Sequence, residues 1–230
     1  MKCKIGLILS AADYLAGGRM KKQVDTLDAT PSKRLFLSII ADYDLNRSIC
    51  ELVDNALDVW VRGGRSSSIE IEISISIDQK TISVSDNAGG LPKSELGFIV
   101  GPGQTGSTST DETIGIFGVG TKRAVVALAQ DIKIKTRHGH SATYQVDFDD
   151  DWLQDEDWEL PVYQVDNVDP GTTVVELQKP RVPISEDAIE HLRDHLGATY
   201  AKFLSPKVLI KLNGVAIEPI LFEGWSFPPG

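Results

Sequence analysis

The sequence has only two cysteines, Cys3 and Cys50, among its 230 residues. Two thiols are too few for a disulfide scaffold, and they fit a reducing compartment. No apolar run approaches the roughly 18 residues that a membrane span needs. The apolar part of residues 1–10 is also shorter than the core of about 7–15 residues in a secretory signal. We therefore expect a cytoplasmic protein without a membrane association.

Positive charge is scarce as well. The chain has 23 Lys and Arg against 33 Asp and Glu, for a formal net charge of −10. The acidic residues are densest in the segment 147–157, and such a run is typical of a solvated loop. This balance argues against a broad DNA-binding face. We expect any contact with DNA or a partner protein to use other segments.

The most informative segment that is present is Glu-Leu-Val-Asp-Asn-Ala-Leu-Asp, residues 51–58. Its periodicity predicts a helix that begins near Arg47, with Asp44 or Asn46 as the N-cap. One stripe is apolar and suits a core, whereas the other carries Glu51, Asp54, Asn55, Asp58 and Arg62. Like charges at this spacing destabilise a helix by a few tenths of a kcal/mol per pair, roughly. A bound cation or a water-activating role would offset that cost, and a solvated face is the alternative.

A second motif follows a predicted β-hairpin. Apolar residues alternate along 68–85, with a turn at 78–80, which indicates a hairpin with one buried face. Asp86 then lies where the second strand leaves the sheet, in the run Ser85–Leu91. A carboxylate there can accept a hydrogen bond from an exocyclic amine, and Gly89 and Gly90 allow close approach to a flat ligand. The alternative is a favourable turn without a ligand.

A third motif, Gly118-Val119-Gly120-Thr121-Lys122, leads into a helical pattern with Thr121 as a possible cap. A glycine-rich loop at a helix N-terminus favours phosphate through its N–H groups and the helix dipole. The spacing fits neither a Walker A loop nor a Rossmann fingerprint. Lys122 either contacts phosphate or simply belongs to the first turn. The Gly/Ser/Thr-rich segment 101–111 is interpreted as a lid, with a linker as the alternative.

A fourth motif is Pro170-Gly171-Thr172, which opens a β-branched strand and places a hydroxyl at its start. We also expect strands at 132–137, 142–148, 173–178 and 208–212, a turn at 213–214, and a helix over 185–196. That helix carries His191 and His195 four residues apart. Without nearby cysteines, a surface helix explains them better than a metal site.

The order and spacing of these four motifs resemble the GHKL ATPases. That family includes DNA gyrase B subunits, MutL, large heat-shock chaperones, MORC proteins and histidine kinases, and the glycine-loop motif is most similar to the MORC and chaperone versions. The resemblance implies an α+β Bergerat fold, a two-layer sandwich of a mostly antiparallel or mixed sheet with helices on one face. It also implies an ATP-binding domain over 31–218, an N-terminal arm over 1–30, and a linker or the start of a transducer region over 219–230.

The resemblance also implies roles for individual residues. Glu51 matches the catalytic base, Asn55 the Mg²⁺ ligand, and Asp58 a further nucleotide contact. At the base end, Asp86 matches the carboxylate that recognises the adenine amine. The remaining implied nucleotide-binding positions are Gly90 and Leu91 at the adenine, Gly118, Val119, Gly120, Thr121 and Lys122 at the phosphates, and Thr172, which supports adenine recognition through water. One departure is Ala88, where the family usually has glycine, because alanine tolerates a positive φ poorly.

The predicted function is therefore Mg²⁺-dependent ATP binding and hydrolysis, with ATP-driven lid closure and homodimerisation, in a DNA-linked repair, chromatin-like or defence system. Family relatives take a lysine for the γ-phosphate from a transducer domain, and little chain follows Gly214 to build one. We therefore expect slow turnover of ATP to ADP by this chain alone. Two alternatives stay open: an ATP sensor that does not hydrolyse, and a histidine-kinase-type domain, although Glu51 disfavours the latter.

Overall fold

The computed structural model describes residues 43–97, 120–155, 157 and 159–221. The predicted N-terminal arm and the predicted lid lie outside these ranges. The helix of the first motif, α2, spans Leu45–Arg62. Its N-cap is Asp44, one of the two predicted caps, whose side chain accepts a hydrogen bond from the Arg47 N–H at 2.8 Å. The predicted apolar stripe is buried in the core.

The strands form one eight-stranded sheet in the order β5-β4-β3-β6-β2-β1-β7-β8. All of its pairings are antiparallel except that between β1 and β7, which is parallel. The strands are β1 (Ile69–Ser76), β2 (Thr81–Asp86), β3 (Ala129–Thr136), β4 (Thr143–Phe148), β5 (Val162–Val165), β6 (Thr173–Pro180), β7 (Val208–Leu212) and β8 (Val215–Ala216). The predicted hairpin is β1–β2, and the predicted mixed sheet is confirmed.

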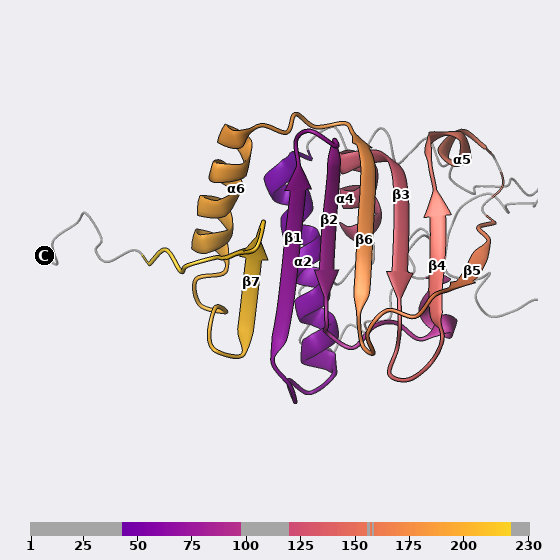
Figure 1. Ribbon diagram of the computed structural model, residues 1–230, viewed down its shortest axis with the longest axis horizontal. Helices are drawn as coiled ribbons and strands as arrows, with labels where there is room; N and C mark the ends of the chain where they lie inside the picture. The colour runs from indigo at the N-terminus through magenta and orange to yellow at the C-terminus, as the bar shows by residue number, and fades with distance from the viewer. Residues whose placement is uncertain (1–42, 98–119, 156, 158, 222–230) are drawn as a thin grey trace, which may run out of the picture. The chain divides into compact units, whose positions relative to one another are not determined.

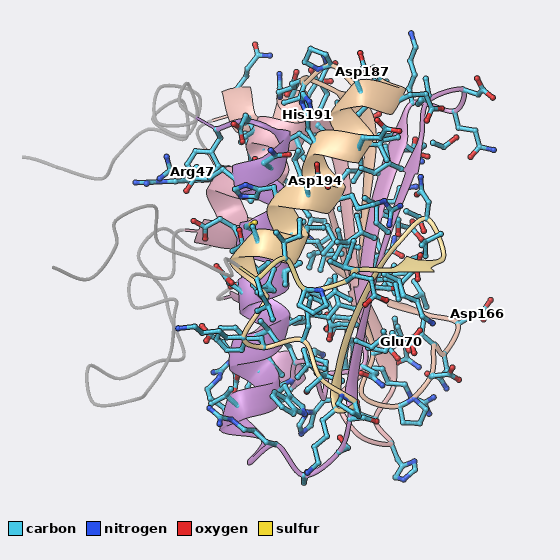
Figure 2. All side chains as sticks on the ribbon, turned by 90° about the vertical axis from the view of Figure 1, so that its left-hand side faces the viewer. Arg47, Glu70, Asp166, Asp187, His191 and Asp194 are labelled. Atoms are coloured by element: carbon cyan, nitrogen blue, oxygen red, sulfur yellow. The ribbon has the colours of Figure 1, made fainter. Side chains whose placement is uncertain are left out.

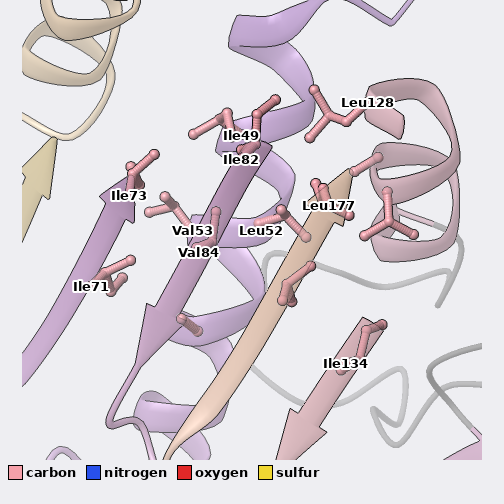
Figure 3. Packing of buried hydrophobic residues seen from close by; sticks show 14 of the residues in the cluster. Ile49, Leu52, Val53, Ile71, Ile73, Ile82, Val84, Leu128, Ile134 and Leu177 are labelled. Atoms are coloured by element: carbon pink, nitrogen blue, oxygen red, sulfur yellow. The ribbon is translucent and has the colours of Figure 1, made fainter. Parts of the chain in front are cut away.

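Three of the helices in the described part of the chain cover one face of this sheet (Figures 1 and 2). They are α2, α4 (Gly120–Leu128) and α6 (Glu186–Thr199), and α2 packs against both of the others. Between the layers lies a continuous apolar core that includes Ile49 and Val53 of α2 and Ile82 and Val84 of β2 (Figure 3). Burial of this kind stabilises by about 1.5–3 kcal/mol per large aliphatic side chain. The arrangement is the expected two-layer sandwich.

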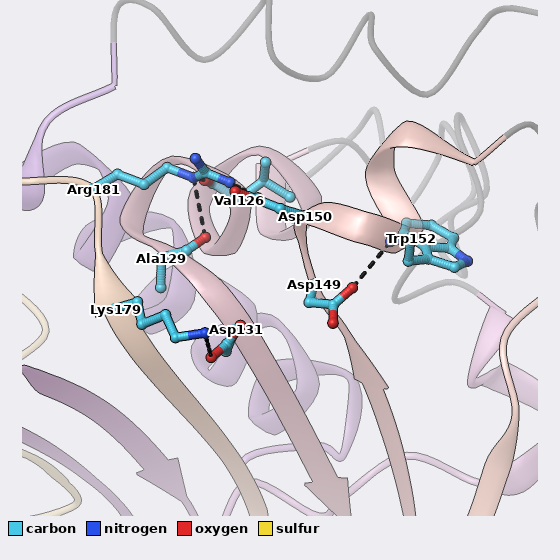
Figure 4. Close-up of polar contacts among 8 residues, drawn as sticks. All are labelled: Val126, Ala129, Asp131, Asp149, Asp150, Trp152, Lys179 and Arg181. Carbon is cyan, nitrogen blue, oxygen red and sulfur yellow. Dashed lines mark hydrogen bonds and ion pairs between the residues drawn. The ribbon is translucent and has the colours of Figure 1, made fainter.

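The acidic segment after β4 is more ordered than the loop that its charge predicts. Asp149 caps a short helix, α5 (Asp150–Gln154), by accepting from the Trp152 N–H at 3.0 Å. Arg181 connects this helix to α4, because its side chain donates to the carbonyls of Val126 and Ala129 and pairs with Asp150 (Figure 4). Charge composition alone did not reveal α5, since its cationic partner Arg181 comes from a separate segment of the chain.

None of the helices within the described ranges is long and apolar enough to cross a membrane. A short 3₁₀ helix (Lys93–Glu95) follows β2, and α6 starts after the cap Ser185, which accepts from the Ala188 N–H at 3.2 Å. The predicted turn at Asn213 and Gly214 joins β7 to β8, with φ values of 50° and 77°.

Candidate functional site

Three neighbouring strands end in one row of polar side chains. Asp86 of β2 lies opposite Thr173 of β6, and Thr173 lies opposite Thr136 of β3. Directly opposed residues of antiparallel strands point to the same side of a sheet. Asp86 is also opposite Ile71 of β1, which is fully buried under the helices, so the whole row faces the helix layer.

Asp86 has the most perturbed environment in this row. Its Oδ1 accepts a hydrogen bond from the Ala88 N–H at 2.9 Å. Burial raises the pKa of this carboxyl from 3.8 to about 7, and the Ala88 hydrogen bond offsets only part of that effect. A carboxyl whose pKa is strongly raised by desolvation, at the end of a strand, is a candidate for ligand recognition.

The turn after Asp86 accommodates alanine without strain. The positive φ values fall on Gly89 (135°) and Gly90 (66°), and Ala88 is not among the positive-φ residues. Glycine is required at position 90 because φ is positive and because a Cβ there would lie 2.2 Å from the Arg137 carbonyl oxygen. Ala88 therefore departs from the family pattern at a position where glycine is not needed.

The second and fourth motifs contact each other directly. The Gly89 N–H donates to the Gly171 carbonyl at 2.8 Å, and a Cβ on Gly171 would lie 3.4 Å from the Gly89 Cα. His138 adds to the same contact, with its Nδ1 3.1 Å from the Gly89 carbonyl oxygen. Segments more than 80 residues apart are thus joined at one end of the sheet.

The hydroxyl groups next to Asp86 belong to residues that sequence reasoning missed. The Leu91 N–H donates to Thr136 Oγ1 at 2.8 Å, and Thr136 Oγ1 lies 3.0 Å from Thr173 Oγ1. The predicted residue, Thr172, is held through its backbone, since its N–H donates to Asp169 and its carbonyl accepts from Arg137. Strand alternation could have identified Thr173, because it shares a parity with the buried Val175 and Leu177.

The helix α2 carries the predicted catalytic and metal-binding residues. Glu51 and Asn55 are partly buried, and Asp58 is 7% exposed. The Asn55 Nδ2 donates to the Glu51 carbonyl, which directs this amide group back along its own helix. The Tyr43 hydroxyl donates to Glu51 Oε1 at 3.3 Å, a contact that the sequence pattern did not predict.

Asp54, which the sequence placed on the polar stripe, contacts Tyr200 just past α6. The hydroxyl of Tyr200, just past α6, donates to Asp54 Oδ1 at 2.8 Å and approaches the Cys50 carbonyl at 3.0 Å. Desolvation raises the pKa of the Cys50 thiol to about 11, so this cysteine is an unreactive, packed thiol. The polar stripe therefore serves two purposes: Glu51, Asn55 and Asp58 belong to the candidate site, and Asp54 contacts Tyr200 at the end of α6.

The phosphate side is described only in part. Gly120, Thr121 and Lys122 form the first turn of α4, and the side chains of Thr121 and Lys122 lie outside the described part. Gly118 and Val119 lie outside it as well. Arg123 follows in the same turn, and its buried Nε has no hydrogen-bond partner among the described residues. A buried guanidinium N–H without an acceptor is costly, and an anionic ligand would satisfy it.

The chain is similar in sequence to a known protein family. Residues 43–179 match the model of the family described as "Histidine kinase-, DNA gyrase B-, and HSP90-like ATPase". The chain belongs to this ATPase family. The GHKL prediction is thereby confirmed, whereas a closer relation to MORC, chaperone or MutL proteins stays a prediction. A comparison with curated proteins gave no match.

Solved structures agree on the fold. The ATPase region of Saccharomyces cerevisiae topoisomerase II bound to ICRF-187 (dexrazoxane) matches with a TM-score of 0.56 at 18% identity, over 75% of this chain and 48% of that one. The ATPase region of the same enzyme also matches in a second structure, with a TM-score of 0.54 at 18% identity over the same shares. At this identity the match shows the fold. This member of the ATPase family spans about half the length of those regions.

The family match covers Glu51 through Thr172, and α6 with Tyr200 lies beyond it. Within the described part of the chain, no three His, Cys, Asp or Glu residues gather as a metal site. His191 is exposed on α6 (Figure 2), and His195 is exposed as well, in agreement with the predicted surface helix.

Proposed function

We propose that this chain is a Mg²⁺-dependent ATP-binding and ATP-hydrolysing domain. The observation that carries the proposal is the partly buried Asp86, in a row with Thr173 and Thr136 at the sheet end and in a chain whose α2 presents Glu51 and Asn55. Membership in the ATPase family supports it.

The base end suits adenine. An ionised carboxylate only accepts hydrogen bonds, so Asp86 would accept from the exocyclic amine of adenine. A base with a keto oxygen at that position would place an acceptor against an acceptor. Because the pKa of Asp86 is about 7, the carboxyl is near the midpoint of its titration at neutral pH, and bound adenine would favour the ionised form. Thr173, and Thr172 as predicted from the sequence, would hold the surrounding hydroxyl and water contacts.

The helix end suits hydrolysis. Glu51 would orient the attacking water and take its proton, with the Tyr43 hydroxyl holding one carboxylate oxygen. The Asn55 amide oxygen is a ligand type that Mg²⁺ accepts, and a single protein oxygen suits an ion that keeps its waters and phosphate ligands. Such an ion neutralises charge on the phosphate oxygens. The Nε of Arg123, which has no hydrogen-bond partner within the described ranges, supports an anion at the start of α4.

We extend the proposal to the behaviour of the longer system. ATP would close the lid over 101–111 and favour a homodimer, and hydrolysis would reset it. The chain spans about half of the matched topoisomerase II regions. We therefore also propose that the lysine for the γ-phosphate comes from outside this chain. The proposed system is cytoplasmic, acts on a DNA-linked substrate and includes partner proteins. We expect slow turnover by this chain alone.

Calorimetry with MgATP tests the binding site first. We expect micromolar to millimolar affinity for the wild type, a loss of about tenfold or more for Asp86→Asn, and weaker Mg²⁺-dependent binding for Asn55→Ala. Inosine triphosphate is the matched ligand, since it differs from ATP in the exocyclic group at the purine 6-position and should bind poorly. Equal affinity for the two nucleotides would contradict the role of Asp86.

Turnover with γ-labelled ATP separates the three candidate activities. Hydrolysis releases free phosphate and should be abolished by Glu51→Gln while ATP still binds. An ATP sensor would release no phosphate, and a kinase-type domain would transfer the label to protein. Retained hydrolysis in Glu51→Gln would contradict the assignment of the base.

A further inference from the structure

The buried hydroxyl of Tyr200 contacts α2, and none of the roles predicted from the sequence involves Tyr200. Its side chain is 2% exposed, and it lies at the C-cap of α6. Its single hydroxyl proton is shared between Asp54 Oδ1 at 2.8 Å and the Cys50 carbonyl at 3.0 Å. The two partners are 146 and 150 residues away in sequence, so the contact joins α6 to α2 and is not local.

The two acceptors are placed beside the residues proposed to act on ATP. Cys50 and Asp54 are one turn apart on α2, and Glu51 and Asn55 each follow them by one position. The Asn55 side chain also donates a hydrogen bond to the backbone carbonyl of Glu51. Because consecutive helical residues are separated by about 100°, α2 presents one pair to α6 and the other to an adjacent face.

A rigid helix transmits rotation from one of these faces to the other. At the 5–6 Å radius of the side-chain envelope, a rotation of about 10° moves a carboxylate by about 1 Å. Catalytic groups must be held within about 0.5 Å and 10–20° of the productive geometry. A contact that fixes the rotation of α2 therefore bears directly on Glu51.

The chemistry of the contact also favours a fixed geometry. Asp54 is partly buried, and the Tyr200 hydroxyl donates to its Oδ1 at 2.8 Å. A buried carboxylate that depends on one donor costs free energy when that donor moves.

We propose that Tyr200 is a positioning residue, which sets the rotation of α2 through Asp54 and Cys50 and thereby places Glu51 and Asn55 for ATP hydrolysis. The inference rests on the proposed function for its catalytic consequence, and on the hydrogen-bond geometry for its mechanical one. It assigns a role to α6, which lies outside the segment that matches the family.

The end of the described chain is attached to the same part of α6. The Ile220 N–H donates to the Gly197 carbonyl at 3.0 Å, within one turn of Tyr200. A Cβ on Gly197 would lie 2.7 Å from the Glu218 carbonyl oxygen, so this approach requires glycine. The segment Glu218–Ile220 therefore packs on the helix end that holds Tyr200, which makes α6 the physical link between it and α2.

Tyr200→Phe tests the proposal because it removes the hydroxyl and keeps the buried ring. We expect kcat to fall about tenfold while the dissociation constant for MgATP changes by less than about threefold. Asp54→Asn keeps an acceptor for the hydroxyl and should retain at least about half of the wild-type kcat, whereas Asp54→Ala should match Tyr200→Phe. The double variant Tyr200→Phe/Asp54→Ala should be no slower than either single variant, because both remove one contact. Tyr163→Phe, an identical change on the exposed strand β5, is the control and should leave kcat unchanged.

Amide hydrogen exchange of the nucleotide-free protein tests, without ATP, whether the Tyr200 hydroxyl stabilises α2. Tyr200→Phe should speed exchange at the α2 amides of residues 54 and 55 by about tenfold relative to β1, and Tyr163→Phe should not. Unchanged exchange, or an unchanged kcat in folded Tyr200→Phe, overturns the proposal. If the wild type neither binds nor hydrolyses ATP, the proposed function fails, and the exchange result still decides whether Tyr200 positions α2. Should Tyr200→Phe not fold, Asp54→Ala against Asp54→Asn gives the same comparison.

Discussion

The base end and the helix end of the candidate site are built in different ways. At the base end, Asp86, Thr173 and Thr136 belong to three adjacent strands, and the backbone ladders of the sheet fix their spacing. At the helix end, Glu51 and Asn55 depend on how α2 rests on its neighbours, including the single hydroxyl of Tyr200. Under the proposed function, affinity for the adenine base and the geometry for catalysis would have separate structural supports. Substitutions in the sheet should therefore change affinity and stability, and substitutions at the α2–α6 contact should change turnover.

The largest effect should come from Gly90→Ala at the base end. The new Cβ would overlap the Arg137 carbonyl oxygen at 2.2 Å, at a φ of +66°. We expect a loss of about 3 kcal/mol or more in the free energy of unfolding, measured by urea denaturation. Gly139→Ala is the matched control, since Gly139 has a φ of +53° and a Cβ added there would meet nothing within 4 Å. It should cost only the roughly 1–2 kcal/mol of the left-handed conformation. Similar losses in the two variants would show that overlap with Arg137 is unimportant.

An intermediate effect is expected from pH. The pKa of Asp86 is raised from 3.8 to about 7, so between these values the folded chain holds a proton that the unfolded chain has released. This contribution to stability is present below about pH 4 and is lost as the pH rises through about 7, with a slope of up to about 1.4 kcal/mol per pH unit. Asp86→Asn should remove that part of the pH dependence of the free energy of unfolding.

Asp78→Asn, at an exposed turn, is the control for this measurement. It should reproduce the wild-type pH profile. A profile for Asp86→Asn that coincides with the wild type would mean that Asp86 is ionised in the folded chain throughout this range.

The smallest effect should distinguish two adjacent threonines. Thr173→Val removes the hydroxyl 3.0 Å from Thr136 Oγ1 and keeps the side-chain shape. We expect a loss of about 1 kcal/mol in stability, the usual net value of one hydrogen bond, and a fall in ATP affinity of about fivefold. Thr172→Val is the matched change one position earlier, and calorimetry on both variants compares them. A larger loss of affinity for Thr172→Val would favour the residue that the sequence motif indicated.

Much of the fold was predictable because it depends on local periodicity. The apolar stripe of α2, the alternation of β1 and the caps Asp44 and Ser185 are visible in short windows of sequence. The order of motifs was enough to indicate the family. Asp86 was found in the same way, since a carboxylate at a strand end followed by two glycines is a local signal.

The rest depends on register and on long-range contacts. The opposition of Asp86 and Thr173 follows from the pairing of β2 with β6, which no short window contains. Tyr200 gives no sequence signal because its partner Asp54 is 146 residues away. Asp54 itself was assigned to the polar stripe because periodicity shows the faces of a helix and does not show what covers each face.

The place of β6 in the sheet has a consequence for the order in which the chain can assemble. The hairpins β1–β2 and β3–β4 each consist of neighbours in sequence, but β6 is inserted between β2 and β3 and pairs with both. The row of Asp86, Thr173 and Thr136 therefore does not exist until the chain has been synthesised through β6 and that strand has paired on both sides. Contacts of such long sequence separation slow folding, because the loops must be closed before the pairing compensates. Binding of an adenine nucleotide would thus indicate that β6 has been incorporated. A ribosome-bound chain that ends before β6 would have both hairpins but not the row of Asp86, Thr173 and Thr136.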